Sequence, residues 1–127
     1  MEFETNQILI TGANGWLGRS LVHSLVYGIE NSHDIDSPNK HLKIKCFVLD
    51  GEDTTFLTTQ SKNVSIYKGN LNNFNDCDFF TKQSRGGVLF HCAGIIHPRK
   101  ISEFYKINVE GTKNILNACV KNNIKKA

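Results

Sequence analysis

Long apolar runs, paired metal ligands and basic stripes are all missing from this sequence. No stretch of about 18 apolar residues occurs, so we expect no membrane-spanning helix. The cysteines have neither C-x-x-C spacing nor a matching histidine pair, which argues against a zinc site. The net charge is only +3, and no basic stripe is interleaved with aromatic residues, so we expect no nucleic-acid partner.

No basic segment followed by an apolar run opens the chain, so we expect no secretory leader. Cys46, Cys77, Cys92 and Cys119 are therefore expected to be free thiols in a reducing, cytoplasmic setting. The 127 residues, of which 39% are apolar and 21% charged, have the composition of one globular domain.

The most informative segment is residues 8–18, which read ILITGANGWLG. A short apolar run predicts a buried strand at 7–11, and an apolar helical pattern predicts a helix at 15–27. Between them come Gly12, Gly15 and Gly18. The segment therefore predicts strand, glycine turn and helix in that order.

Each glycine of this turn suits the binding of a dinucleotide. Gly12 permits a tight turn, Gly15 lets a pyrophosphate approach the backbone, and Gly18 lets helix and strand pack closely. The helix N-terminus favours anions. The spacing is G-x-x-G-x-x-G rather than the usual G-x-G-x-x-G, and the alternative is a turn with a helix cap. The strand and helix around the glycines favour the dinucleotide site.

The rest of the chain continues to alternate strands with helices. Further strands are expected at 43–50, 64–68 and 88–92, helices at 74–83 and 102–122, and loops at 28–41 and 51–61, the latter with at most a short helix. Ser102 is the expected N-cap of the last helix. This pattern predicts an α/β, doubly wound Rossmann-type fold: about four parallel strands in the order 3-2-1-4, with helices on both faces.

Five motifs in order resemble the extended short-chain dehydrogenase/reductase family, in particular its NAD-dependent sugar-nucleotide epimerases and dehydratases. They are TGANGWLG at 11–18, FVLD at 47–50, GNL at 69–71, HCAG at 91–94 and NVEGTKNIL at 108–116. The family usually has G-D-L or G-D-I where this chain has GNL. The resemblance covers residues 8–119, so residues 1–127 are expected to form the N-terminal part of an NAD(P)-binding Rossmann-type domain.

The resemblance implies a cofactor site, with NAD favoured over NADP. Its expected residues are Gly12, Ala13, Asn14, Gly15, Trp16, Leu17, Gly18, Asp50, Asn70, Leu71, Cys92, Ala93, Gly94 and Asn108. Asp50 would bind the ribose hydroxyls and repel a 2′-phosphate, and its alternative is an ordinary strand-end cap. Asn108 has the alternative of a helix-surface amide. His91 is expected to be a packed strand residue, and His97 and Arg99 to be solvated.

The family's catalytic Tyr-x-x-x-Lys pair is missing from these residues, so no catalytic residue is assigned. Four residues after Tyr27, Tyr67 and Tyr105 come Asn, Leu and Val. We expect the front half of an enzyme acting on a nucleotide sugar, without strand five or the substrate domain and inactive alone. The alternatives are a non-catalytic NAD(P)-sensing or interaction module and a remnant that binds no cofactor. An exposed edge at 88–90 and a second apolar row on the 102–122 helix predict self-association.

Overall fold

The predicted sheet and its strand order are confirmed. The computed structural model describes residues 6–28, 42–94 and 99–127. Its strands, all parallel, lie in the order β3-β2-β1-β4. They are β1 (Gln7–Thr11), β2 (Lys43–Val48), β3 (Val64–Lys68) and β4 (Val88–His91). The chain moves to one side of β1 for β2 and β3 and returns to the other side for β4.

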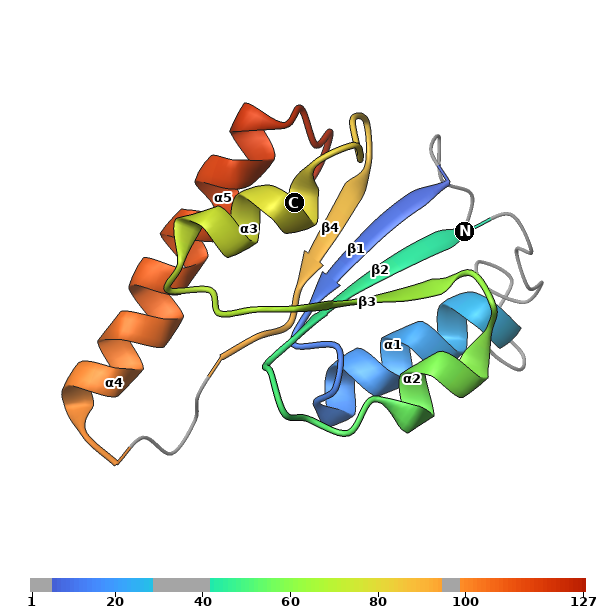
Figure 1. The fold of residues 1–127 in the computed structure, drawn as a ribbon, viewed down its shortest axis with the longest axis horizontal. Helices are drawn as coiled ribbons and strands as arrows, with labels where there is room; N and C mark the ends of the chain where they lie inside the picture. Colours follow the sequence, from blue (N-terminus) through green and yellow to red (C-terminus); the bar gives the residue numbers. More distant parts are fainter. Residues whose placement is uncertain (1–5, 29–41, 95–98) are drawn as a thin grey trace.

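Helices cover both faces of this sheet (Figure 1). On one face lie α1 (Trp16–Tyr27) and α2 (Thr55–Gln60), and on the other α3 (Phe74–Thr81) and α5 (Gly111–Lys121). The short helix α4 (Ile101–Tyr105) extends beyond the end of the sheet. Ile8 and Ile10 join the core under α1, whereas Leu9 between them joins the core under α3 and α5. Because successive strand residues point to opposite faces, a sheet covered on both faces needs the continuous apolar run that marks β1.

One long helical segment follows β4, as predicted, but it contains an irregular turn. Between α4 and α5 the residues Lys106–Glu110 form a π-helical turn, η1, in which the Gly111 N–H donates to the Lys106 carbonyl five residues earlier. The expectation that Ser102 is the N-cap was wrong. Lys100 holds that position without a side-chain cap, and a Glu103 carboxylate oxygen accepts from the Arg99 N–H at 3.2 Å. Ser102 therefore lies inside the first turn.

The shorter helices follow their predicted places. Asn73 caps α3 by accepting from the N–H groups of Asn75 and Asp76, and the helix ends at Thr81 rather than at residue 83. Gln83 adopts φ +58°, which is incompatible with a continuing right-handed helix. The short helix α2 lies in the predicted 51–61 loop. The predicted 28–41 loop lies outside the described residues, apart from Gly28, which ends α1.

The end of the chain corrects the expectation of a bare edge at β4. Lys126 forms a parallel bridge with Val88. The Leu89 N–H donates to the Lys126 carbonyl at 2.8 Å, and the Lys125 N–H donates to the Gly87 carbonyl at 2.8 Å. The first half of the β4 edge is therefore paired, in the position of a fifth parallel strand reached through α5.

Two further expectations concern membranes and metals. Within residues 6–28, 42–94 and 99–127, no helix is long and apolar enough to cross a membrane. Over the same residues, no group of three or more histidine, cysteine, aspartate or glutamate side chains is placed to hold a metal ion.

Candidate functional site

An open cavity of about 470 Å³ lies at the carboxyl ends of the strands, a size within the usual range for small-molecule sites. In a doubly wound sheet this edge, next to the switch between β1 and β4, is where ligands bind. Predicted site residues on its wall are Gly12, Asn14, Gly15, Asn70, Leu71, Cys92, Ala93 and Gly94. The wall also includes Phe47, Val48, Leu49, Glu52, Gly69 and Ile107, none of which was predicted as a site residue.

Gly12 makes the turn after β1, and two separate constraints require glycine there. Its φ is +62°, in the left-handed region that side chains disfavour. A Cβ at this position would lie 2.6 Å from the backbone nitrogen of Ala93. Gly18 is equally enclosed, since a Cβ there would lie 2.6 Å from the Ala13 Cα. These glycines bring β1, α1 and the loop after β4 into direct contact.

Gly15 differs from both, because the protein itself does not require glycine at this position. Its φ is −74°, and a Cβ would meet only the Gly12 carbonyl oxygen, at an ordinary 3.4 Å. Gly15 lines the cavity and is the N-cap of α1, where it supplies no capping side chain. The first turn of α1 contains no acidic residue. An anion in the cavity therefore meets helix N–H groups without a competing carboxylate from that turn.

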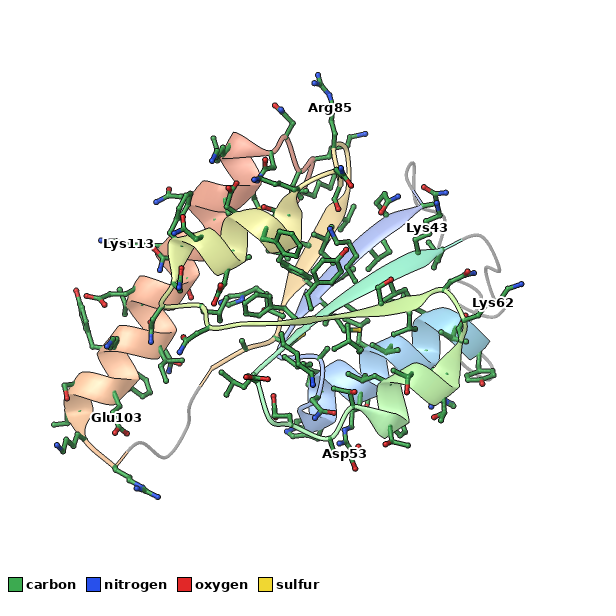
Figure 2. All side chains as sticks on the ribbon, in the orientation of Figure 1. Lys43, Asp53, Lys62, Arg85, Glu103 and Lys113 are labelled. Atoms are coloured by element: carbon green, nitrogen blue, oxygen red, sulfur yellow. The ribbon has the colours of Figure 1, made fainter. Side chains whose placement is uncertain are left out.

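Asn14 holds the glycine turn against the loop after β2. Its Nδ2 donates to the Asp53 carbonyl at 2.8 Å, and its Oδ1 accepts from Arg19 Nη2 at 3.0 Å. Arg19 also stacks 5.2 Å from the centroid of the Phe56 ring. Figure 2 shows Asp53 near the end of the sheet where the strands have their carboxyl ends, while Lys43 and Lys62 lie at the opposite end. Asn14 thus fixes the shape of the turn.

Three acids follow β2, namely Asp50, Glu52 and Asp53, and the one that lines the cavity is not the predicted Asp50. Asp50 is exposed and is not among the cavity-lining residues, and its Oδ1 accepts from the Gly51 N–H at 3.1 Å. Glu52 lines the cavity, and its Oε1 accepts from the Leu49 N–H at 2.8 Å. The signal that could have found Glu52 is a second carboxylate two residues beyond the strand-end acid.

Asn70 and Leu71 come from the loop between β3 and α3. The Asn70 Oδ1 accepts from the Asn72 N–H at 2.9 Å, so the amide oxygen already stabilises its own loop. The Leu71 carbonyl accepts from Asn114 Nδ2 of α5 at 2.7 Å, and a Cβ on Gly111 would lie 3.1 Å from the Leu71 Cβ. Gly111 and Asn114, two residues of the NVEGTKNIL motif, therefore hold this wall of the cavity against α5.

The remaining predicted residues surround the cavity without lining it. They are Ala13, Trp16, Leu17, Gly18, Asp50 and Asn108. Ala13 is buried, Trp16 is 80% exposed at the start of α1, and a Cβ on Gly94 would lie 3.2 Å from the Asn108 Oδ1. Their contacts with a cofactor stay predictions. His97 lies outside the described residues.

The cysteines are free, and only Cys92 lines the cavity among those described. Burial raises the pKa of the Cys46 thiol to about 12 and that of the Cys119 thiol to about 11. Burial, and then the charge of Asp76, raise the pKa of Cys77 to about 11. Burial also raises the pKa of half-buried Cys92. These thiols stay protonated near neutral pH, which makes them poor nucleophiles.

Comparison with known proteins gives one family over almost the whole chain. The model of the "NAD dependent epimerase/dehydratase family" matches residues 8–127. The uncharacterized protein y4nL of Sinorhizobium fredii is 33% identical over 120 residues, which cover 94% of this chain and 33% of y4nL. The decarboxylating sterol-4-alpha-carboxylate 3-dehydrogenase of Saccharomyces cerevisiae is 27% identical over 122 residues, which cover 91% and 31% of the respective chains.

A solved structure shows the same fold. The Bordetella bronchiseptica enzyme WbmG, crystallised in complex with NAD, superposes with a TM-score of 0.70 at 21% identity. The match covers 94% of this chain and 35% of WbmG. The chain spans about a third of the length of the curated relatives it matches.

Proposed function

The chain belongs to the NAD dependent epimerase/dehydratase family, and from that premise we propose that its cavity binds NAD. The observation that carries the proposal is Gly15. Neither its backbone angle nor its neighbours require glycine, yet it lines the cavity at the N-terminus of α1. A missing side chain at this place leaves room for a pyrophosphate to reach the helix N–H groups.

The residues around the cavity suit the two halves of a dinucleotide. The pyrophosphate would lie over the Gly12–Gly15 turn. The adenosine half would lie between the ends of β2 and β3, where Leu49 and Leu71 offer apolar walls. The other half would extend along the Cys92–Gly94 wall after β4, where small residues leave room. Bound NAD supplies a hydride acceptor, and this chain's residues position it.

A preference for NAD over NADP follows from the acids after β2. We assign the larger part to Glu52, which lines the cavity, and the smaller part to the originally predicted Asp50. A carboxylate accepts hydrogen bonds from ribose hydroxyls, whereas it repels a 2′-phosphate. Neutralising the acid that faces the ribose should therefore bring the dissociation constants for NAD and NADP closer together.

The family also suggests the reaction that a longer protein carries out. We propose oxidation of a hydroxyl of a nucleotide sugar by bound NAD, with later return of the hydride. Within these 127 residues no tyrosine is followed four positions later by lysine, so we expect binding without turnover. A non-catalytic NAD(P)-sensing module is the alternative, and a partner whose affinity changes with NAD would favour it. We propose the cytoplasm as the location of this protein.

The test uses the chain's single tryptophan, Trp16, which lies at the start of α1 beside the glycine turn. Titration with NADH should quench Trp16 emission saturably, and NADPH should bind more weakly. Glu52→Gln should reduce the ratio of the two dissociation constants more than Asp50→Asn does. The absence of saturable quenching by either nucleotide would contradict the proposed function. An equal ratio in wild type and Glu52→Gln would contradict only the assignment of Glu52.

A further inference from the structure

A chain of hydrogen bonds runs behind the cavity wall and joins three elements. The Thr11 Oγ1, at the end of β1, lies 2.6 Å from the Nδ1 of His91 at the end of β4. The Nε2 of the same ring lies 2.9 Å from the Thr112 Oγ1 in α5. At the two ends, the Ala93 N–H donates to Thr11 Oγ1 at 3.4 Å and the Thr112 hydroxyl donates to the Asn108 carbonyl at 2.7 Å.

These contacts permit only one direction of donation. A carbonyl oxygen can only accept, so the Thr112 hydroxyl proton is committed to the Asn108 carbonyl. The Thr112 oxygen must then accept from a protonated Nε2 of His91. In the neutral imidazole Nδ1 is therefore bare, and it accepts from the Thr11 hydroxyl. Every donor thus points the same way, from the Ala93 N–H to the Asn108 carbonyl.

We propose that His91, held as the Nε2–H tautomer, is a positioning residue that sets the cavity wall for dinucleotide binding. The inference rests on the proposed function. Ala93 lines the cavity and touches the Gly12 turn, while Asn108 lies in the π-helical turn beside the cavity-lining Ile107. The ring joins these two walls. Burial lowers the pKa of His91, which agrees with a neutral ring.

The position of Thr112 makes the proposal testable without changing a residue that lines the cavity. Thr112→Val keeps the shape of the side chain but removes both its donor and its acceptor. Thr112→Ser restores both. Thr81→Val is the matched control. The Thr81 hydroxyl also donates four residues back, to the Cys77 carbonyl at 2.9 Å, and it is fully buried, but away from the cavity.

The measurements are the NADH dissociation constant and the thermal midpoint of each variant. Thr112→Val loses both the hydrogen bond from His91 and the one to the Asn108 carbonyl. Loss of the His91 bond, if it has ordinary strength, should weaken NADH binding about threefold to tenfold, and Thr112→Ser should recover it. Thr81→Val should lower the midpoint and leave the dissociation constant unchanged. His91→Asn, which keeps the acceptor toward Thr11 but loses the donor toward Thr112, should weaken binding like Thr112→Val.

A spectroscopic measurement tests the direction of the hydrogen bonds separately. Long-range ¹H–¹⁵N correlation of the His91 ring should show a proton on Nε2, and a proton on Nδ1 would overturn the proposal. Wild-type NADH binding by Thr112→Val would overturn it as well, with the proposed function intact. If the wild-type chain itself binds no NADH, the proposed function fails and the inference fails with it.

Discussion

Two glycines three residues apart have different reasons for being glycine. Gly12 has a positive φ, and a Cβ at this position would lie 2.6 Å from the backbone nitrogen of Ala93, so the fold requires glycine here. Gly15 has neither constraint and lines the cavity, so the fold tolerates a side chain there. The sequence pattern alone treats the two glycines as one motif, whereas their surroundings separate a folding role from a binding role.

This difference predicts opposite results for two substitutions to alanine. Gly12→Ala should lower the free energy of unfolding by at least about 2 kcal/mol, because it combines a left-handed residue with a backbone clash. Gly15→Ala should lower it by less than about 1 kcal/mol, the ordinary cost of alanine at an N-cap. Urea denaturation of both variants gives the comparison. Equal losses of unfolding free energy in the two variants would contradict a folding role for Gly12 and a binding role for Gly15.

Strand β2 carries a buried amine that ties it to the turn before β4. The Lys45 Nζ donates to the Lys82 carbonyl at 3.0 Å and to the Ser84 Oγ at 2.9 Å, and it lies 4.6 Å from the centroid of the Tyr67 ring. Burial lowers the pKa of Lys45 to about 8. Lys45 therefore loses its proton in the folded chain at a pH where the unfolded chain still holds it.

This element should make stability depend on pH. Between about pH 8 and the ordinary lysine value near 10.5, the unfolded state binds more protons at Lys45, so its contribution to stability rises with pH. The buried thiols, whose pKa values are raised, act in the opposite direction. The difference between wild type and Lys45→Met, measured by urea denaturation across this range, isolates Lys45. A difference that is constant with pH would contradict the lowered pKa.

How far the sequence predicts each element depends on the range of the interaction involved. The strands and the glycine turn follow from local patterns, because apolar runs and glycine spacing are local properties. The strand order follows from the general topology of doubly wound folds. Asn14 and Leu71 line the cavity, and their contact with a cofactor stays a prediction. The π-helical turn Lys106–Glu110 was not predicted, because one extra residue within a helix hardly changes a 3.6-residue period.

The missed site residues depend on contacts that no residue pattern indicates. Glu52 reaches the cavity because its loop folds back on the Leu49 N–H. The second carboxylate is visible in the sequence, but the contact that brings it to the cavity is not. Thr112 and Asn114 belong to the NVEGTKNIL motif, but the sequence assigned neither of them a role. Their partners, His91 and Leu71, lie 21 and 43 residues away, so their roles need the assembled fold.

At the scale of the whole molecule, the outer face of the long helix has no cover among the described residues. Ile101 is 87% exposed and Val120 is 80% exposed, with Tyr105 and Leu116 also exposed. Figure 2 shows Lys113 pointing outward from this helix, away from the sheet. With Lys125 and Lys126 pairing the first half of the β4 edge, we assign the predicted self-association to the helix face rather than to that edge.

Self-association through this face should depend on its apolar side chains. Light scattering over a concentration series should show a dimer whose population rises with concentration. Val120→Lys should shift it to monomer, because a charge would have to be desolvated in the interface. Lys62→Ala, which lies on the other side of the molecule from this helix, serves as a control for a general effect of surface charge. A wild-type chain that stays monomeric at the highest concentration would contradict this assignment.

The central claim is that the cavity at the ends of the strands binds NAD through the glycine turn. Isothermal titration calorimetry of the purified chain with NAD⁺, beside Gly15→Val, tests it most directly. The account predicts stoichiometric binding by wild type and none by Gly15→Val, with equal thermal midpoints within a few degrees. Binding that survives in Gly15→Val, or no binding by wild type, would contradict it.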